Sequence, residues 1–176
     1  MEFTLRDFQP EDFDTLWSID QRCFAPGIAY SRRELAIYIR RRGSFTVVAE
    51  EASSTGMTSR TPVRTSSGAS SGIVGFIVAE ASRGVGHIIS IDVLPESRRS
   101  GLGSKLLAAA EERLRALGCS AVILETAVDN TSALAFYKRH QYGVMKVVPR
   151  YYSNDVDAFV LEKEFSSEPE VLEQQG

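Results

Sequence analysis

The spacing of hydrophobic and polar positions along the chain changes between a strand-like period of two and a helical period of three to four. Alternating or continuously apolar runs predict strands over residues 2–8, 45–50, 73–81, 87–95, 120–128, 143–152 and 157–165. Helical spacing predicts helices from Pro10 to about residue 24, from Ser31 to about residue 40, over 101–117 and over 130–141. The pattern therefore predicts a domain that mixes both kinds of element.

Local signals mark several of the helix boundaries. Ser31 and Glu34 stand three residues apart at the start of the second helix, which is the spacing of a capping box. Pro10 fits the first turn of the first helix. Gly118 follows the last apolar residue of the third helix, where a C-terminal glycine is expected.

The order of the elements predicts a mixed α/β (α+β) single domain. One strand–helix–strand unit, from 87 to 128, lies within a chain of strands otherwise joined by hairpins. The strand at 87–95, "HIISIDVLP", is continuously apolar, so we expect it at the centre of the sheet. A doubly wound parallel sheet is not expected, because no further strand–helix units follow.

Two segments lack the residues needed to form a core. Residues 52–72 are rich in Ser, Thr and Gly, which predicts a flexible surface loop inside the 1–165 domain. A regulatory or partner-binding role for this loop is the alternative. The acidic tail at 166–176 is expected to be disordered.

Composition excludes several functional classes. The formal net charge of −3 argues against a nucleic-acid binder, and no apolar run is long enough to cross a membrane. The first residues lack a secretory pattern, so we expect a cytoplasmic protein. Cys23 and Cys119 form no disulfide framework, and His87 and His140 are too scattered to indicate a metal site.

The stretch "PESRRSGLGSKLL" at residues 95–107 has the composition of an anion-binding helix start. The first amides of a helix lack acceptors and carry a partial positive charge. Gly101 and Gly103 let a phosphate approach the backbone, while Arg98 and Arg99 can add charged donors. An ordinary helix start with two solvated arginines remains the alternative.

Two well-known phosphate motifs do not fit this stretch. Lys105 follows Ser104 at the wrong spacing for a Walker loop. A dinucleotide fingerprint would need a third glycine and a tight turn directly after the strand, and the chain has neither, although Glu125 stands where a ribose-binding acid would.

The pattern Arg98-x-x-Gly101-x-Gly103 after a central strand resembles the signature of the GNAT superfamily of N-acetyltransferases. The resemblance extends over residues 2 to about 165 and implies the GNAT fold, a mostly antiparallel sheet of about seven strands flanked by about four helices. It implies acetyl-CoA as co-substrate and no metal. The cofactor contacts implied are Ile91, Val93, Arg98, Arg99, Ser100, Gly101, Leu102, Gly103, Ser104, Asn130, Ala133 and Tyr137.

A second segment, "LETAVDNTSALAFYKRHQY", resembles the RimI-type N-terminal acetyltransferases within that family. A protonated amine cannot attack a thioester, so a base must remove a proton, and the departing thiolate leaves better when an acid protonates it. Glu125 is the candidate base, directly or through water, and Tyr137 the candidate acid. A strand-end carboxylate and a core tyrosine remain the alternative interpretations of the two residues.

The resemblance places the substrate entrance near Tyr30, Tyr151 and Tyr152. Their aromatic rings would suit a peptide or protein N-terminus with a small first residue, such as that of a ribosomal protein. A surface tyrosine without a substrate role is the alternative for each. A small-molecule amine, a lysine side chain and a non-catalytic acyl-CoA-binding module stay open as alternatives. We expect a monomer or homodimer.

Overall fold

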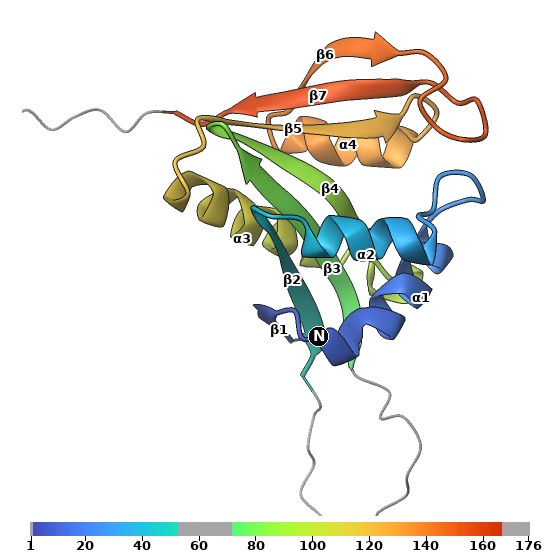
Figure 1. The fold of residues 1–176 in the computed structure, drawn as a ribbon, viewed down its shortest axis with the longest axis vertical. Helices are drawn as coiled ribbons and strands as arrows, with labels where there is room; N and C mark the ends of the chain where they lie inside the picture. Colours follow the sequence, from blue (N-terminus) through green and yellow to red (C-terminus); the bar gives the residue numbers. More distant parts are fainter. Residues whose placement is uncertain (1, 53–71, 167–176) are drawn as a thin grey trace, which may run out of the picture.

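The computed structural model describes residues 2–52 and 72–166, and all of its strands belong to one sheet (Figure 1). The strands are β1 (Phe3–Asp7), β2 (Ser44–Glu51), β3 (Ile73–Ser82), β4 (Val85–Val93), β5 (Ala121–Ala127), β6 (Gly143–Val148) and β7 (Ala158–Glu164). The helices are α1 (Phe13–Cys23), α2 (Arg32–Arg40), α3 (Leu102–Ala116) and α4 (Thr131–Arg139), with single 3-10 turns at Pro10–Asp12 and Pro95–Ser97.

The sheet has seven strands in the order β1-β2-β3-β4-β5-β7-β6. Every neighbouring pair is antiparallel except β4 and β5, which α3 connects in parallel. The predicted mixed, mostly antiparallel sheet and the central position of the apolar fourth strand are therefore confirmed.

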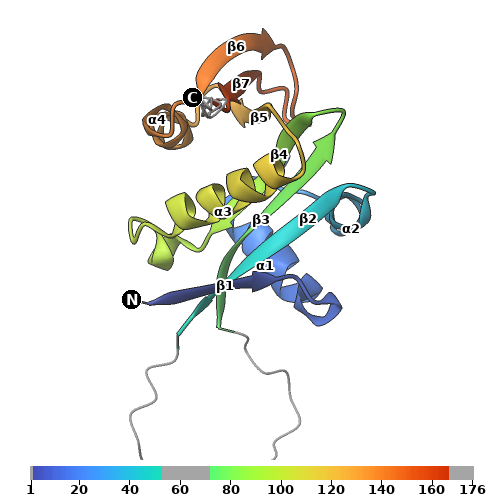
Figure 2. The same cartoon turned by 90° about the vertical axis from the view of Figure 1, so that its left-hand side faces the viewer.

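The helices cover the two faces of the sheet. Figure 2 shows α3 and α4 on one side and α1 and α2 on the other. A side chain at Gly86 of β4 would collide with Leu114 of α3, so Gly86 faces that helix. His87 consequently points to the face that α2 covers.

The core lies between α3, the central strands and α1. Phe76, Ile77 and Val78 of β3 are completely buried, because helices cover this strand from both sides. Local signals act as predicted at the helix starts. The Ser31 side chain and the Glu34 backbone and side chain form the reciprocal capping box of α2.

The sixth predicted strand is too long. β6 ends at Val148, four residues before the predicted end at residue 152. Pro149 cannot donate to a sheet ladder, and Arg150 has a left-handed φ of 47° while its amide bonds the Asp157 carboxylate. Tyr151 and Tyr152 therefore lie in the loop between β6 and β7.

Most of the predicted loop at 52–72 and the tail at 166–176 lie outside the described residues. Within the described residues, no helix is long and apolar enough to cross a membrane.

Candidate functional site

The two parallel strands at the centre of the sheet separate halfway along their length. Pairing of β4 with β5 runs from Val85 and Ala121 to Ile88 and Leu124 and stops there, and beyond this point the strands diverge (Figure 1). Backbone groups of residues 89–93 that point toward β5 thus have no strand partner there.

Side chains occupy part of this open edge of β4. Tyr30 donates its hydroxyl to the Ile89 carbonyl at 3.2 Å, and the Val93 carbonyl accepts from Arg98 Nε at 3.0 Å and Cys23 Sγ at 3.4 Å. Alternate residues of a strand direct their backbone groups to the same edge, so Ile91 also faces the gap.

Burial, with a smaller contribution from Asp92, raises the pKa of the Cys23 thiol to about 11.

The predicted anion-binding stretch forms a turn that leads into α3. Ser100 Oγ donates to the Ser97 carbonyl at 2.6 Å, and Gly101 adopts a left-handed φ of +82° immediately before the helix. The backbone amides of residues 99–104 find no acceptor within the described part of the chain. We call residues 99–104 the anion seat, because such a row of unpaired amides at a helix start attracts anions.

The two arginines and the second glycine differ in their roles. Arg98 uses Nε to hold the Val93 carbonyl, and Arg99 is exposed with a left-handed φ of 59°. At Gly103, a Cβ would lie 3.4 Å from the ring of Phe136. The ring of Phe136 from α4 therefore lies directly beside the start of α3.

Helix α4 brings the candidate acid to the site. The Asn130 side chain accepts from the Ala133 amide at 3.1 Å and so caps the start of α4. Tyr137 is buried and packs edge-on against Phe136 and Tyr142. Burial, reinforced by the nearby Asp92 charge, raises the pKa of the Tyr137 hydroxyl, so the hydroxyl stays protonated at neutral pH.

The candidate base, Glu125, lies inside β5 rather than at its end, and it has a partner that the sequence did not reveal. His87 Nε2 lies 2.6 Å from Glu125 Oε2, across the point where β4 and β5 separate. Glu80 of β3 lies on the other side of this imidazole, with 3.9 Å between Oε1 and His87 Nδ1. Glu125 therefore has one carboxylate oxygen held by His87.

The three tyrosines predicted at the substrate entrance do come together, with a fourth, Tyr38. Tyr30 lies 5.1 Å from Tyr38 and Tyr151 4.9 Å from Tyr152, measured between ring centroids. Burial is the main cause of the raised pKa of Tyr152, and Tyr151 and Glu125 add to it. This tyrosine cluster (Tyr30, Tyr38, Tyr151 and Tyr152) thus lies beside the candidate base.

The loops that carry these tyrosines also touch one another. Gly27, between α1 and α2, accepts from both the amide (3.2 Å) and the hydroxyl (2.9 Å) of Ser153, between β6 and β7. A Cβ at Gly27 would lie only 2.9 Å from Asn154, so glycine allows this close approach. The contact joins the part of the sheet before the β4–β5 gap to the part after it.

Two buried carboxyl groups lie between α1 and β4. Asp20 and Asp92 are almost completely buried, and each has an Oδ1 atom without a hydrogen-bond partner. Asp20 Oδ2 accepts from the Tyr30 amide, and Asp92 Oδ2 from Ser90 Oγ. Burial raises the pKa of Asp20 to about 6 and that of Asp92 well above its ordinary value, where the Asp20 charge adds to the effect.

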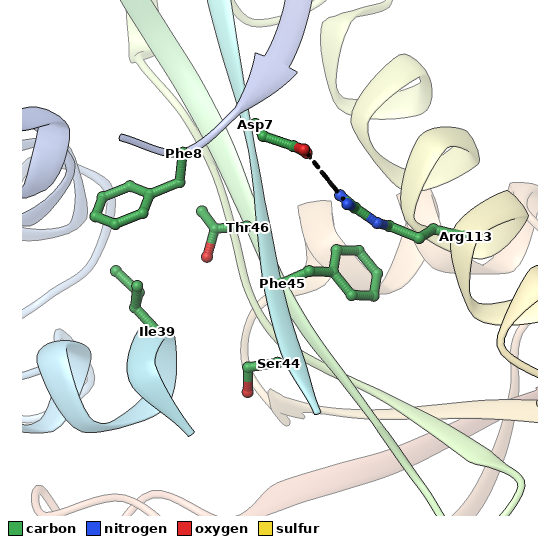
Figure 3. Close-up of a pocket in the computed structure, with 7 residues that line it drawn as sticks. All are labelled: Asp7, Phe8, Ile39, Ser44, Phe45, Thr46 and Arg113. Carbon is green, nitrogen blue, oxygen red and sulfur yellow. Dashed lines mark hydrogen bonds and ion pairs between the residues drawn. The ribbon is translucent and has the colours of Figure 1, made fainter. Parts of the chain in front are cut away.

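A hollow of about 240 Å³ opens at a different place, where β1 has ended and β2 continues (Figure 3). Its lining residues are Asp7, Phe8, Ile39, Ser44, Phe45, Thr46 and Arg113. None of the predicted site residues lines it, so we do not assign it to the candidate site. Among residues 2–52 and 72–166, no group of three or more His, Cys, Asp or Glu side chains is placed to hold a metal ion.

A split parallel strand pair next to a helix start with unpaired amides is an arrangement that suits a phosphate-bearing ligand along a strand edge. Comparison with known proteins identifies the family. The model of the acetyltransferase (GNAT) family matches residues 13–142. The chain belongs to this family, as its sequence resemblance predicts.

Individual relatives agree with this assignment. An uncharacterized N-acetyltransferase of Methanocaldococcus jannaschii is 37% identical over 52% of this chain and 59% of its own length. N-alpha-acetyltransferase 30 of Schizosaccharomyces pombe is 36% identical over 42% of this chain and 49% of its own. The chain thus spans about half the length of the curated relatives it matches.

Structural similarity to known proteins extends over more of the chain than sequence similarity does. The crystal structure of the ribosomal-protein-S18-alanine N-acetyltransferase from Escherichia coli superimposes with a TM-score of 0.76. The match covers 97% of this chain and 99% of that one at 20% identity, a likeness of fold alone.

We predict that Asp20→Asn stabilises the protein above about pH 6. The raised pKa of Asp20 means that folding favours its protonated form, and this contribution is lost as pH rises from about 4 through about 6. Asparagine stays neutral and still accepts from the Tyr30 amide. The free energy of unfolding at pH 8 should rise by up to about 3 kcal/mol, at about 1.4 kcal/mol per pKa unit.

Urea unfolding of both proteins at pH 4 and pH 8 measures this difference. The exposed Asp155→Asn is the matched control and should change little at either pH. An Asp20→Asn protein that is no more stable than wild type at pH 8 would contradict the prediction.

We predict that Gly101→Val weakens coenzyme A binding about tenfold or more. A side chain there must either leave the left-handed conformation or stand over the anion seat, and both disturb the row of amides. Gly118, after the other end of α3, is a matched control with a φ of +84° and the same open space around a Cβ.

Both valines should cost similar folding energy, about 1–2 kcal/mol, because both are forced into the left-handed region. Only Gly101→Val should lower coenzyme A affinity in calorimetric titration. Equal affinities for the two variants would place the ligand's phosphates elsewhere.

Proposed function

We propose that this protein transfers the acetyl group of acetyl-CoA to a primary amine, the N-terminal α-amine of a peptide or protein. The observation that carries the proposal is the anion seat, which opens beside the β4–β5 gap where Glu125 and Tyr137 also lie. Family membership supports acetyl transfer, and the relative named N-alpha-acetyltransferase 30 supports the α-amine as acceptor.

The residues present fit the cofactor. The amides of the anion seat, unpaired within the described residues, and the guanidinium groups of Arg98 and Arg99 suit its diphosphate. Ile91 and Val93 border the gap, where an extended pantetheine arm could take the place of a paired strand. Asn130, the N-cap of α4, and Ala133 and Tyr137 of the same helix complete the proposed cofactor contacts.

The chemistry divides between two groups of this chain. Acetyl-CoA supplies an activated thioester. Glu125, oriented by the His87 imidazole, accepts a proton from the substrate ammonium directly or through a water molecule. Tyr137 gives its proton to the departing sulfur, since burial keeps the hydroxyl protonated until it is needed.

The tyrosine cluster supports a peptide end as the acceptor. The Tyr151–Tyr152 pair lies near Glu125, and the Tyr30–Tyr38 pair lies near those two tyrosines. The Ser153–Gly27 contact joins the two loops involved. Flat, rigid rings bind a flexible chain end at low entropic cost. The proposed substrate is a cytoplasmic protein, such as a ribosomal protein, whose first residue is small, as for the RimI-type enzymes.

We predict that Glu125→Gln and Tyr137→Phe each lower kcat by about 100-fold or more, the range expected for losing a general base or acid. Both substitutions keep the shape of the side chain, so affinity for acetyl-CoA should change much less. Steady-state kinetics with an N-terminal peptide, beside calorimetric titration of coenzyme A, separates the two effects. Near-normal kcat in either variant removes that residue from the mechanism.

Thiol release from acetyl-CoA, measured across peptides that differ only in their first two residues, tests the function itself. Peptides with a free amino terminus beginning with Ala or Ser should react fastest. The same peptides with a blocked amino terminus and an internal lysine, and a polyamine, are the controls. Faster reaction with either control would assign the enzyme to lysine side chains or small amines instead.

A further inference from the structure

One polar contact joins the anion seat to the end of α4. Ser104 Oγ, in the first turn of α3, lies 2.9 Å from Nε2 of His140, the residue that ends α4. The imidazole also packs against Phe136, with 4.7 Å between ring centroids, and Phe136 in turn covers Gly103. The ring is therefore fixed beside the seat from two directions.

The direction of the Ser104–His140 hydrogen bond decides what Ser104 can do. A serine hydroxyl has one proton to donate. If His140 Nε2 accepts that proton, Ser104 has no donor left for an anion. If Nε2 carries a proton and donates to Oγ, the serine proton is free to point toward the seat.

We propose that His140 is a positioning residue of the anion seat, which donates from Nε2 to Ser104 Oγ and so directs the Ser104 hydroxyl toward the cofactor's diphosphate. An anion bound to the unpaired amides favours the tautomer with the proton on His140 Nε2, because the anion then gains the Ser104 hydroxyl as a further donor. The inference rests on the proposed function, since it assumes that the diphosphate occupies residues 99–104.

The surroundings of His140 favour a neutral ring that can adopt either tautomer. Burial lowers the pKa of His140, and Lys163 of β7 and Arg139 of α4 lower it further, while Glu111 of α3 opposes them. An apolar side chain would fill the space against Phe136 equally well. Only a polar residue at position 140 can form a hydrogen bond with Ser104.

A double-mutant cycle tests the inference. Calorimetric titration of coenzyme A is carried out at about pH 8 on wild type, Ser104→Ala, His140→Leu and the double variant. Each single change should weaken binding roughly tenfold, the size of one hydrogen bond to a charged group, and the double variant should bind no more weakly than either. Multiplying losses, or unchanged affinity in His140→Leu, would overturn the inference.

The conservative variant His140→Gln separates positioning from packing. Its amide can donate to Ser104 Oγ, so affinity at about pH 8 should stay within about threefold of wild type. Glutamine cannot gain a charge, so wild type should gain an advantage only below the lowered pKa of His140. A His140→Gln variant as weak as His140→Leu would indicate a merely structural role.

The Gly101→Val variant distinguishes this inference from the proposed function. If Gly101→Val weakens coenzyme A binding but the Ser104 and His140 variants do not, only the inference fails. If none of them weakens binding, the seat itself is misassigned. Thermal unfolding of every variant shows whether a loss of affinity reflects a loss of fold.

Discussion

The arrangement of the candidate site follows from the early end of pairing between β4 and β5. A central parallel pair normally keeps its ladder along its whole length, because unpaired backbone groups inside a protein are costly. Here the ladder stops at Ile88 and Leu124, and side-chain donors from Tyr30, Arg98 and Cys23 satisfy part of the exposed edge. What remains is a stretch of backbone at Ile91 that a ligand can pair with.

A gap in the middle of a sheet requires contacts that hold the two parts together. Glu111 of α3 accepts from the Tyr142 hydroxyl and from Lys163 of β7, both at 2.8 Å. These bonds connect α3, which packs on β2 to β4, with the strands beyond the gap. Losing one partner of such a buried pair leaves a charge uncompensated, which typically costs 3–5 kcal/mol. Phe136 of α4, which lies beside Gly103, adds a further contact between α3 and the part of the chain after the gap.

Features that depend on residues close together in the chain could be predicted from the sequence. The capping box at Ser31, the cap at Asn130 and the glycine before α3 are local signals, and the structure contains each of them. The partners of Glu125 and Ser104 could not be predicted. His87 stands 38 residues from Glu125 along the chain, and His140 stands 36 residues from Ser104. Such pairs depend on the register of β4 against β5 and on the packing of α4, which hydrophobic spacing does not specify.

The thiol of Cys23 illustrates how the surroundings of the gap suit acyl chemistry. It donates to the Val93 carbonyl, and burial raises its pKa to about 11. Thioesters exchange readily with thiolates but hardly at all with thiols. A cysteine so close to the proposed path of an acyl thioester therefore stays an inert hydrogen-bond donor and does not take up the acyl group itself.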